Sequence, residues 1–351
     1  MRFHFVRRLI STCATLVLLA ACGRSATDAP TAHRAFYFWR TTFALTPVEQ
    51  EAVRALHVER IYLRMFDVAW SENDKTTVPL GPVTLGAGAT MPADVEIVPV
   101  VYLKTDVFKH VTTAQLPMLA RKVWADVQGR AGALGFRPHE LQVDCDWTET
   151  TREGFFGLVR ELKVASALPL SSTIRLHQVK YRERTGVPPV DRGTLMFYNM
   201  GKFSADPDAR MIFDADSAAK YLARIDEYPI ALDVALPIWS WTVHLRDDLV
   251  VGLMQSTDPA ELPALDFLAA DGPERFVATR SAFLHGTFLR EGDVLKIEVT
   301  GPAETAAAAD MLAPHLRGDG TARTITLFDL SERNLTRHGT DQLDRLFRSL
   351  R

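Results

Sequence analysis

The stretch LQVDCDWTETTREGFFGLVREL (141–162) joins a buried strand to an amphipathic helix. Its first seven residues are mostly apolar, which is typical of a strand inside a sheet. Thr150 and Glu153 then fit the pattern of a capping box, and apolar residues recur with helical spacing from Phe155 to Leu162. A strand followed at once by a covering helix is the repeating unit of α/β folds.

Similar strand-like runs occur along the whole chain. The eight runs are 35–40, 60–68, 96–103, 141–147, 170–179, 194–201, 231–241 and 324–330, and helical patterns lie at 47–57, 113–134, 151–166, 215–227, 303–315 and 341–350. Apolar strands that alternate with helices indicate a parallel sheet, and eight such units predict a closed (β/α)8 barrel of the TIM type. The alternative is an open doubly wound sheet, which would have a glycine-rich loop after its first strand. Residues 35–47 contain no glycine.

Two stretches depart from this regularity. Residues 69–95 are rich in glycine and proline where the second helix is expected, and they predict an irregular connection after the second strand. Residues 276–300 alternate on both sides of a turn at 290–293, which predicts a β-hairpin insertion before the eighth strand. Apart from these, residues 35–351 are expected to form a single barrel domain.

The N-terminus predicts export. Three arginines, a short apolar run and small residues indicate a signal peptide over residues 1–21, and the run is too short for a transmembrane helix. Leu19-Ala-Ala-Cys22 resembles the lipobox of bacterial lipoproteins, which implies acylation of Cys22 and attachment to a membrane. An ordinary signal peptide with an incidental cysteine is the alternative. Gly23 implies the outer membrane, so the expected location is the cell envelope, facing the periplasm, with residues 22–34 as lipidated cysteine and flexible tether.

The composition and charge of the chain argue against some classes of function, such as nucleic-acid binding and metal-dependent chemistry. The chain is 47% hydrophobic and 24% charged, which is ordinary for a globular protein. Loss of residues 1–21 removes three of the 40 basic residues and none of the 43 acidic ones, so the remaining negative charge does not favour nucleic acid as a partner. With Cys13 in the signal peptide and Cys22 acylated, Cys145 has no partner for a disulfide. The ten histidines lack metal-ligand spacing, so neither a metal nor a cofactor is predicted.

Polar and aromatic residues gather where the predicted strands end. In a (β/α)8 barrel, the carboxyl ends of the strands open onto one face and supply the reactive groups. The residues at these ends are Trp39, Arg40, Arg64, Asp67, Tyr102, Lys104, Asp144, Asp146, Trp147, Arg175, His177, Tyr198, Asn199, Trp239, Trp241 and Asp329. The sequence therefore predicts one opening lined by acidic groups and indole rings.

The acidic pair on the fourth strand is the centre of this prediction. Asp144 and Asp146 share one face of the strand, and Cys145 takes the other and should pack under the helices. Two carboxylates so close repel each other, which raises at least one pKa unless a cation lies between them. Arg64, Arg175 and Lys104 are candidates for that cation.

This stretch resembles a motif of family 18 glycoside hydrolases, which are (β/α)8 chitinases and their relatives. Their fourth strand ends in Asp-x-x-Asp-x-Asp-x-Glu, often with Trp before the Glu. Here the residues are Asp144-Cys-Asp146-Trp147-Thr-Glu149, with one residue too many before Glu149 and with Leu141 at the first Asp. The resemblance implies that Glu149 protonates the glycosidic oxygen and that Asp146 stabilises the developing positive charge or orients an acetamido group.

Two further family positions can be compared. Tyr198 matches a tyrosine that lines the sugar site on the sixth strand, whereas Trp239 and Trp241 lie one strand earlier than the tryptophan of the family. The chain as a whole is similar to a group of bacterial lipoproteins that share a conserved domain of unknown function. The stretches that carry this similarity are FYFWRTTF, YLRMFDV, VDCDWTETTR, TIRLHQVKYRERTGVPPVDRG and FYNMGK.

Each candidate also has a structural interpretation. Asp144 and Asp146 could anchor Arg175 and Arg64 in an ion network, and Glu149 could simply precede a helix N-terminus, where negative charge is favourable. Trp39, Trp147, Trp239 and Trp241 are sugar-stacking candidates, and core packing is the alternative for each. Arg175, His177, Tyr198 and Asn199 could bind hydroxyl, carboxylate or acetamido groups, and Arg64 and Asp67 complete the predicted substrate contacts.

The sequence therefore leads to two functional hypotheses. The first is an envelope lipoprotein whose glycoside-hydrolase-like barrel cleaves or binds a glycan, such as an amino-sugar polymer or an exopolysaccharide. The second is a catalytically inactive barrel that binds a glycan or a protein at the envelope. The departures around Glu149 keep the second hypothesis open.

Overall fold

The computed structural model describes residues 32–198, 204, 206, 209–254, 257–316 and 322–350. The predicted signal peptide, the lipidation site at Cys22, Gly23 and Asn199 lie outside the described residues. Within the described ranges, no helix combines the length and apolar character needed to cross a membrane.

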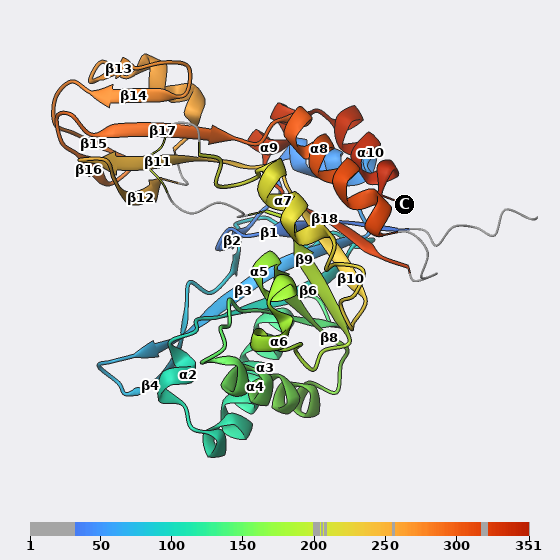
Figure 1. The fold of residues 1–351 in the computed structure, drawn as a ribbon. Helices are drawn as coiled ribbons and strands as arrows, with labels where there is room; N and C mark the ends of the chain where they lie inside the picture. The colour runs from blue at the N-terminus through green and yellow to red at the C-terminus, as the bar shows by residue number, and fades with distance from the viewer. Residues whose placement is uncertain are drawn as a thin grey trace, which may run out of the picture.

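Eight parallel strands close into a barrel (Figure 1). They are β1 (His33–Phe38), β3 (Arg60–Ser71), β6 (Glu96–Leu103), β7 (Leu141–Asp144), β8 (Leu170–Arg175), β9 (Arg192–Met196), β10 (Leu232–Pro237) and β18 (Thr324–Phe328). Each strand pairs with the next in this order, and β1 closes the ring by pairing with both β3 and β18. The structure confirms the predicted TIM-type barrel, and each of its strands overlaps one of the eight predicted runs, although β1 and β9 begin before their runs and β3 ends after its run.

Helices cover the outside of the barrel. The longer ones are α1 (Pro47–Ala55), α3 (Leu116–Leu134), α4 (Arg152–Ser166), α7 (Ala215–Leu222), α8 (Pro302–Leu312) and α10 (Thr340–Ser349), with short helices at α2 (Val107–His110), α5 (Leu176–Lys180), α6 (Arg182–Thr185) and α9 (Glu332–His338). Figure 1 shows α3 and α4 on one side of the barrel and α8 and α10 on the opposite side. The capping box predicted at Thr150 is not formed: α4 begins after Thr151, whose Oγ1 accepts a hydrogen bond from Thr148 N instead.

The connection after the second barrel strand is irregular, as predicted. Strand β3 continues past the barrel and pairs antiparallel with β4 (Thr76–Leu80), which forms a projecting arm. A two-residue strand, β5 (Thr84–Leu85), follows, and residues 72–95 contain no helix. The second covering helix of a regular barrel is therefore absent here.

The insertion before β18 is larger than the predicted hairpin at 276–300. A five-stranded antiparallel sheet is formed by β11 (Ser240–Arg246), β12 (Leu249–Met254), β13 (Leu268–Ala270), β14 (Arg275–Ala278) and β17 (Val294–Val299), and β15 (Ala282–Leu284) pairs with β16 (Thr287–Leu289). The run 231–241 is not one strand, because β10 ends at Pro237 and the chain enters the insertion sheet at Ser240. Figure 1 shows this sheet extending away from the barrel.

Strand alternation gives the barrel two apolar cores, and a third apolar cluster lies within the insertion. The outer core packs between the strands and the helices, and it contains Cys145 and Trp147. The inner core fills the barrel. It includes Ala35, Tyr37 and Tyr62, and it extends to Trp241 on the insertion sheet. Burial raises the pKa of the Cys145 thiol well above its usual value, which makes it an inert core residue.

Ion pairs occupy the amino-terminal end of the barrel. Arg60 Nε lies 2.9 Å from Glu96 Oε2, and Arg192 Nη2 lies 2.6 Å from Asp233 Oδ1. Asp233 Oδ1 also accepts a 2.7 Å hydrogen bond from Thr324 N. These ion pairs link neighbouring strands at the amino-terminal end of the barrel. The candidate site lies at the opposite end.

Candidate functional site

Asp144 lies inside the barrel at the end of β7 and is only 3% exposed. Its Oδ1 accepts hydrogen bonds from Thr173 Oγ1 at 2.5 Å and from Arg175 Nη2 at 3.0 Å, both on β8. Strand alternation accounts for this placement, since Cys145 faces the outer core. Of the three cations considered from the sequence, Arg175 is the one that pairs with Asp144.

Two tyrosines lie near this ion pair. Tyr102 on β6 is directly opposite Asp144 in the β6–β7 ladder, and burial raises its pKa to about 12, with a further contribution from the Asp144 carboxylate. Tyr198 is buried, and its hydroxyl donates to Met196 Sδ at 3.0 Å. Burial lowers the pKa of Arg175, but Asp144 and its neighbours raise it more, so the guanidinium stays charged.

Asp146 and His177 are the exposed polar residues at this end. His177 Nε2 lies 3.6 Å from Asp146 Oδ1, and their side chains are 44% and 54% exposed. Partial burial, with Arg175 nearby, lowers the pKa of His177, while Asp146 opposes the shift. His177 is therefore mainly neutral at pH 7 and can both donate and accept hydrogen bonds.

Aromatic rings surround Phe328 at the end of β18. Its ring centroid lies 5.5 Å from Trp39, 5.1 Å from Trp239 and 5.8 Å from Tyr198. Trp239 also meets Tyr198 edge-on at 4.7 Å. Trp39 and Trp239 are half-buried, so part of each indole stays accessible. We refer to this end of the barrel, with Trp39, Tyr102, Asp144, Arg175 and Trp239, as the mouth.

Two of the predicted tryptophans do not offer a free ring. Trp147 is fully buried in the outer core, where it stacks on Phe155 at 4.9 Å and its Nε1 donates to Thr185 O at 2.9 Å. Trp147 therefore takes the core-packing position that the sequence offered as its alternative, because the alternation that turns Asp144 into the barrel turns Cys145 and Trp147 outward. Trp241 is 5% exposed on β11, and its Nε1 donates to Glu298 Oε2 at 3.1 Å.

Glu149 is exposed in the turn between β7 and α4. Among the described residues, it makes no hydrogen bond and no ion pair, so nothing fixes its carboxylate in the orientation that an acid catalyst needs. Thr148 occupies the place that the family motif gives to glutamate, and its hydroxyl contacts Thr150 Oγ1 at 3.0 Å.

Arg64 and Asp67 pair with each other on β3. Arg64 Nη2 lies 2.6 Å from Asp67 Oδ1, and Arg64 Nη1 donates to Gly81 O at 2.9 Å, which ties the pair to the segment after β4. The structural alternative in which Arg64 neutralises Asp144 or Asp146 is therefore not realised. Asn199 lies outside the described residues.

Phe328 and Asp329 also belong to this end of the barrel. The sequence places Asp329 at a strand end without indicating a role for it, and it does not single out Phe328. Phe328 occupies an inward position on the last strand, which alternation in TITLFDL could have indicated. Asp329 Oδ1 accepts a 2.7 Å hydrogen bond from Asn334 Nδ2, and burial raises its pKa to about 6 against the opposing effects of Arg40 and Arg333. Its environment depends on α1 and α9, which no local pattern reveals.

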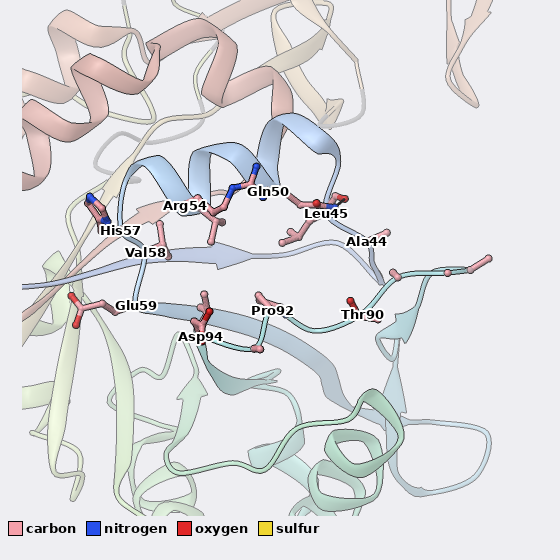
Figure 2. A pocket seen from close by; sticks show the side chains of 16 residues that line it. Ala44, Leu45, Gln50, Arg54, His57, Val58, Glu59, Thr90, Pro92 and Asp94 are labelled. Carbon is pink, nitrogen blue, oxygen red and sulfur yellow. Dashed lines mark hydrogen bonds between the residues drawn. The ribbon is translucent and has the colours of Figure 1, made fainter.

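A separate cavity of about 760 Å³ lies on the outside of the barrel. Figure 2 shows it between α1 and the irregular segment that carries Thr90, Pro92 and Asp94. None of the predicted site residues lines it. In the described part of the chain, no group of three or more His, Cys, Asp or Glu side chains is placed to hold a metal ion.

Comparison of the sequence with protein-family models and with curated proteins found no match. The fold is similar to that of the spore cortex-lytic enzyme SleL of Bacillus megaterium, with 10% identity, a TM-score of 0.53 and coverage of 92% of this chain and 75% of the other. A chitinase from Chromobacterium violaceum gives 11% identity, a TM-score of 0.48 and coverage of 91% and 98%. The chitinase-like agglutinin of Robinia pseudoacacia gives 13% identity, a TM-score of 0.49 and coverage of 89% and 99%. The similarity to SleL is one of fold, a TIM-type barrel shared at 10% identity.

Proposed function

We propose that the mouth binds a glycan chain. The observation that carries this proposal is the pair of half-buried indoles, Trp39 and Trp239, that flank Phe328 at the same end of the barrel as Asp144 and Arg175. The apolar face of a pyranose ring packs on an indole, and nearby polar groups orient its hydroxyls. Such a combination of rings and hydrogen-bonding groups is what a sugar site requires.

The polar residues suit a neutral or amino-sugar ligand. Asp146 accepts hydrogen bonds, Tyr102 stays protonated to high pH and donates, and His177 can do either. The charge of Arg175 is compensated by Asp144, so this pair adds no net positive charge that would attract an acidic sugar. The ligand class is therefore an amino-sugar polymer or a neutral exopolysaccharide.

Binding without cleavage is the better-supported form of this function. A glycosidase needs two carboxyl groups on opposite sides of the scissile bond, one of them held as the acid. Asp144 is committed to Thr173 and Arg175, Thr148 stands at the motif position of the glutamate, and Glu149 has no partner that orients it.

Hydrolysis is the second candidate, and the exposed Asp146 beside His177 favours it. These two side chains put a carboxylate and a proton-transferring group within 3.6 Å of each other. Turnover of oligosaccharides by the wild type, abolished in Asp146→Asn or Glu149→Gln with binding retained, would establish hydrolysis. Binding by all three proteins without product supports the binding function.

The binding experiment uses calorimetric titration with chitin oligosaccharides, cell-wall fragments and exopolysaccharide fragments. We expect Trp239→Ala to weaken the affinity for the bound member about 10-fold or more, because a stacking surface is lost. The matched control is Phe283→Ala, which removes a 71% exposed ring from the β15–β16 hairpin. Equal affinity in wild type and Trp239→Ala, or no binding of any fragment, would contradict the proposal.

We also propose that the barrel is anchored to the cell envelope through acylated Cys22, because the basic start, the apolar run and the lipobox occur in the right order. Metabolic labelling with a fatty acid, followed by membrane fractionation, should label the wild type and not Cys22→Ala. A wild type that stays unlabelled and appears in the soluble periplasmic fraction would instead indicate an ordinary signal peptide.

A further inference from the structure

We propose that Glu298 is a positioning residue for the mouth: it fastens the insertion sheet to the barrel and holds Trp241 against the ring of Trp239. This inference rests on the proposed glycan-binding function, since its consequence is a change in glycan affinity. It makes the insertion sheet part of the ligand site instead of an independent appendage.

The carboxylate of Glu298 accepts hydrogen bonds from three N–H groups. Its Oε1 accepts hydrogen bonds from the backbone nitrogens of Met211 and Ile212, each at 2.6 Å, and its Oε2 accepts from Trp241 Nε1 at 3.1 Å. The residue is 2% exposed on β17 and faces Trp241 directly in the β11–β17 ladder. A buried carboxylate with three donors is well satisfied, and each of the three groups depends on it.

Lys296 reinforces the same attachment. It lies two residues before Glu298, on the same face of β17, and is 1% exposed. Its ammonium donates to Asp206 O at 2.7 Å and to Ala209 O at 2.6 Å. Two neighbouring side chains on one face of the insertion sheet therefore bind the backbone between β9 and α7, at residues 206, 209, 211 and 212.

The attachment reaches the ligand site through aromatic contacts. The ring of Trp241 lies 6.2 Å from that of Trp239 at an interplanar angle of 75°. Trp239 in turn contacts Phe328 and Tyr198. Trp239 is thus held by the barrel on one side and by Trp241 on the other, and Glu298 fixes the indole of Trp241.

Glutamine cannot replace Glu298 in this role. A glutamine side chain has one accepting oxygen, and its amide nitrogen would face an N–H donor. At least one of the three donors would lose its acceptor, and a buried unsatisfied donor drives local rearrangement. The Glu298→Gln variant keeps the size of the side chain, so any effect reports on hydrogen bonding.

The test measures glycan affinity by calorimetry and exchange of the Trp241 indole N–H by NMR, at a temperature at which all proteins are folded. We expect Glu298→Gln to bind about 10-fold more weakly and to exchange this proton faster. The matched control is Asp293→Asn. Asp293 is also a buried carboxylate near β17, but it pairs with His244 and Arg246 toward the other end of the ladder. This control should lose thermal stability and keep wild-type affinity and exchange.

The outcomes separate this inference from the function on which it rests. Wild-type binding that is unchanged in Glu298→Gln overturns the positioning role alone, and so does an equal loss of affinity in Asp293→Asn. Absence of glycan binding by the wild type overturns the proposed function itself, while indole exchange still reports whether Glu298 holds Trp241. If Glu298→Gln does not fold, Trp241→Phe removes the donor and keeps a ring, and wild-type affinity in that variant overturns the inference.

Discussion

The guanidinium of Arg175 lies 3.0 Å from the carboxylate of Asp144, inside the barrel. Replacing Asp144 with alanine would leave Arg175 in a largely buried site without its counter-charge. We expect Asp144→Ala to lower the free energy of unfolding by about 3–5 kcal/mol, measured by urea denaturation. Asp146 lies two residues further along, beyond the end of β7, and its side chain is 54% exposed, so Asp146→Ala should change it by less than about 0.5 kcal/mol. If Asp144→Ala lowers the free energy of unfolding as little as Asp146→Ala does, the ion pair contributes little to stability.

Substitution of Trp147 should lower stability without weakening glycan binding, in contrast to the expected effect of Trp239→Ala. Trp147→Phe removes the hydrogen bond to Thr185 O and part of a fully buried ring, so the free energy of unfolding should fall by about 1–3 kcal/mol. Glycan affinity should stay within twofold of wild type, because Trp147 lies in the outer core. A large loss of affinity with unchanged stability would place Trp147 in the ligand site after all.

Asp329 should make stability depend on pH in the mildly acidic range. Burial raises its pKa from 3.8 to about 6, so between these values the folded protein holds a proton that the unfolded chain releases. The contribution of Asp329 therefore becomes less favourable as pH rises from 4 to 6, by at most about 1.4 kcal/mol per pH unit. Asp329→Asn lacks this titration, so the difference in free energy of unfolding between wild type and variant should change with this sign. A pH-independent difference would refute the shifted pKa.

Cys145 should resist thiol reagents in the folded protein. Burial, together with the neighbouring carboxylates of Asp144 and Asp146, raises the pKa of its thiol, and no part of the residue is exposed. Mass spectrometry of the peptide that contains Cys145 should detect alkylation only above the midpoint of urea unfolding. Rapid modification without denaturant would indicate an opening of the outer core.

The fold was accessible from the sequence because strand periodicity and helix spacing are local. Stretch 141–162 shows both, and each barrel strand overlaps one predicted run. The insertion was underestimated because Trp239 and Trp241 continue the apolar character of β10, which hides the end of that strand at Pro237. The exact end of a strand depends on which neighbour supplies its hydrogen bonds, and that neighbour lies far away in sequence.

Part of the candidate site could be predicted from the sequence for the same reason. The alternation of side chains along a strand correctly placed Asp144 inside the barrel. The same alternation places Trp147, three residues later, in the outer core. The pairing of Arg175 with Asp144 depends on side-chain reach between two strands. The pairing of Arg64 with Asp67 lies within β3, and Arg64 also binds Gly81 O, which is distant in sequence. The role of Glu298 depends on residues more than eighty positions away along the chain.

The insertion sheet leaves and rejoins the barrel through a single paired position, since Ser240 on β11 lies opposite Val299 on β17. Directly opposed residues of antiparallel strands have Cα atoms only about 5 Å apart. A short turn could therefore span the gap between β10 and α8 if residues 241–298 were removed. Such a deletion would also take away Trp241, Lys296 and Glu298, so it would expose one side of Trp239 and free the backbone that these side chains hold.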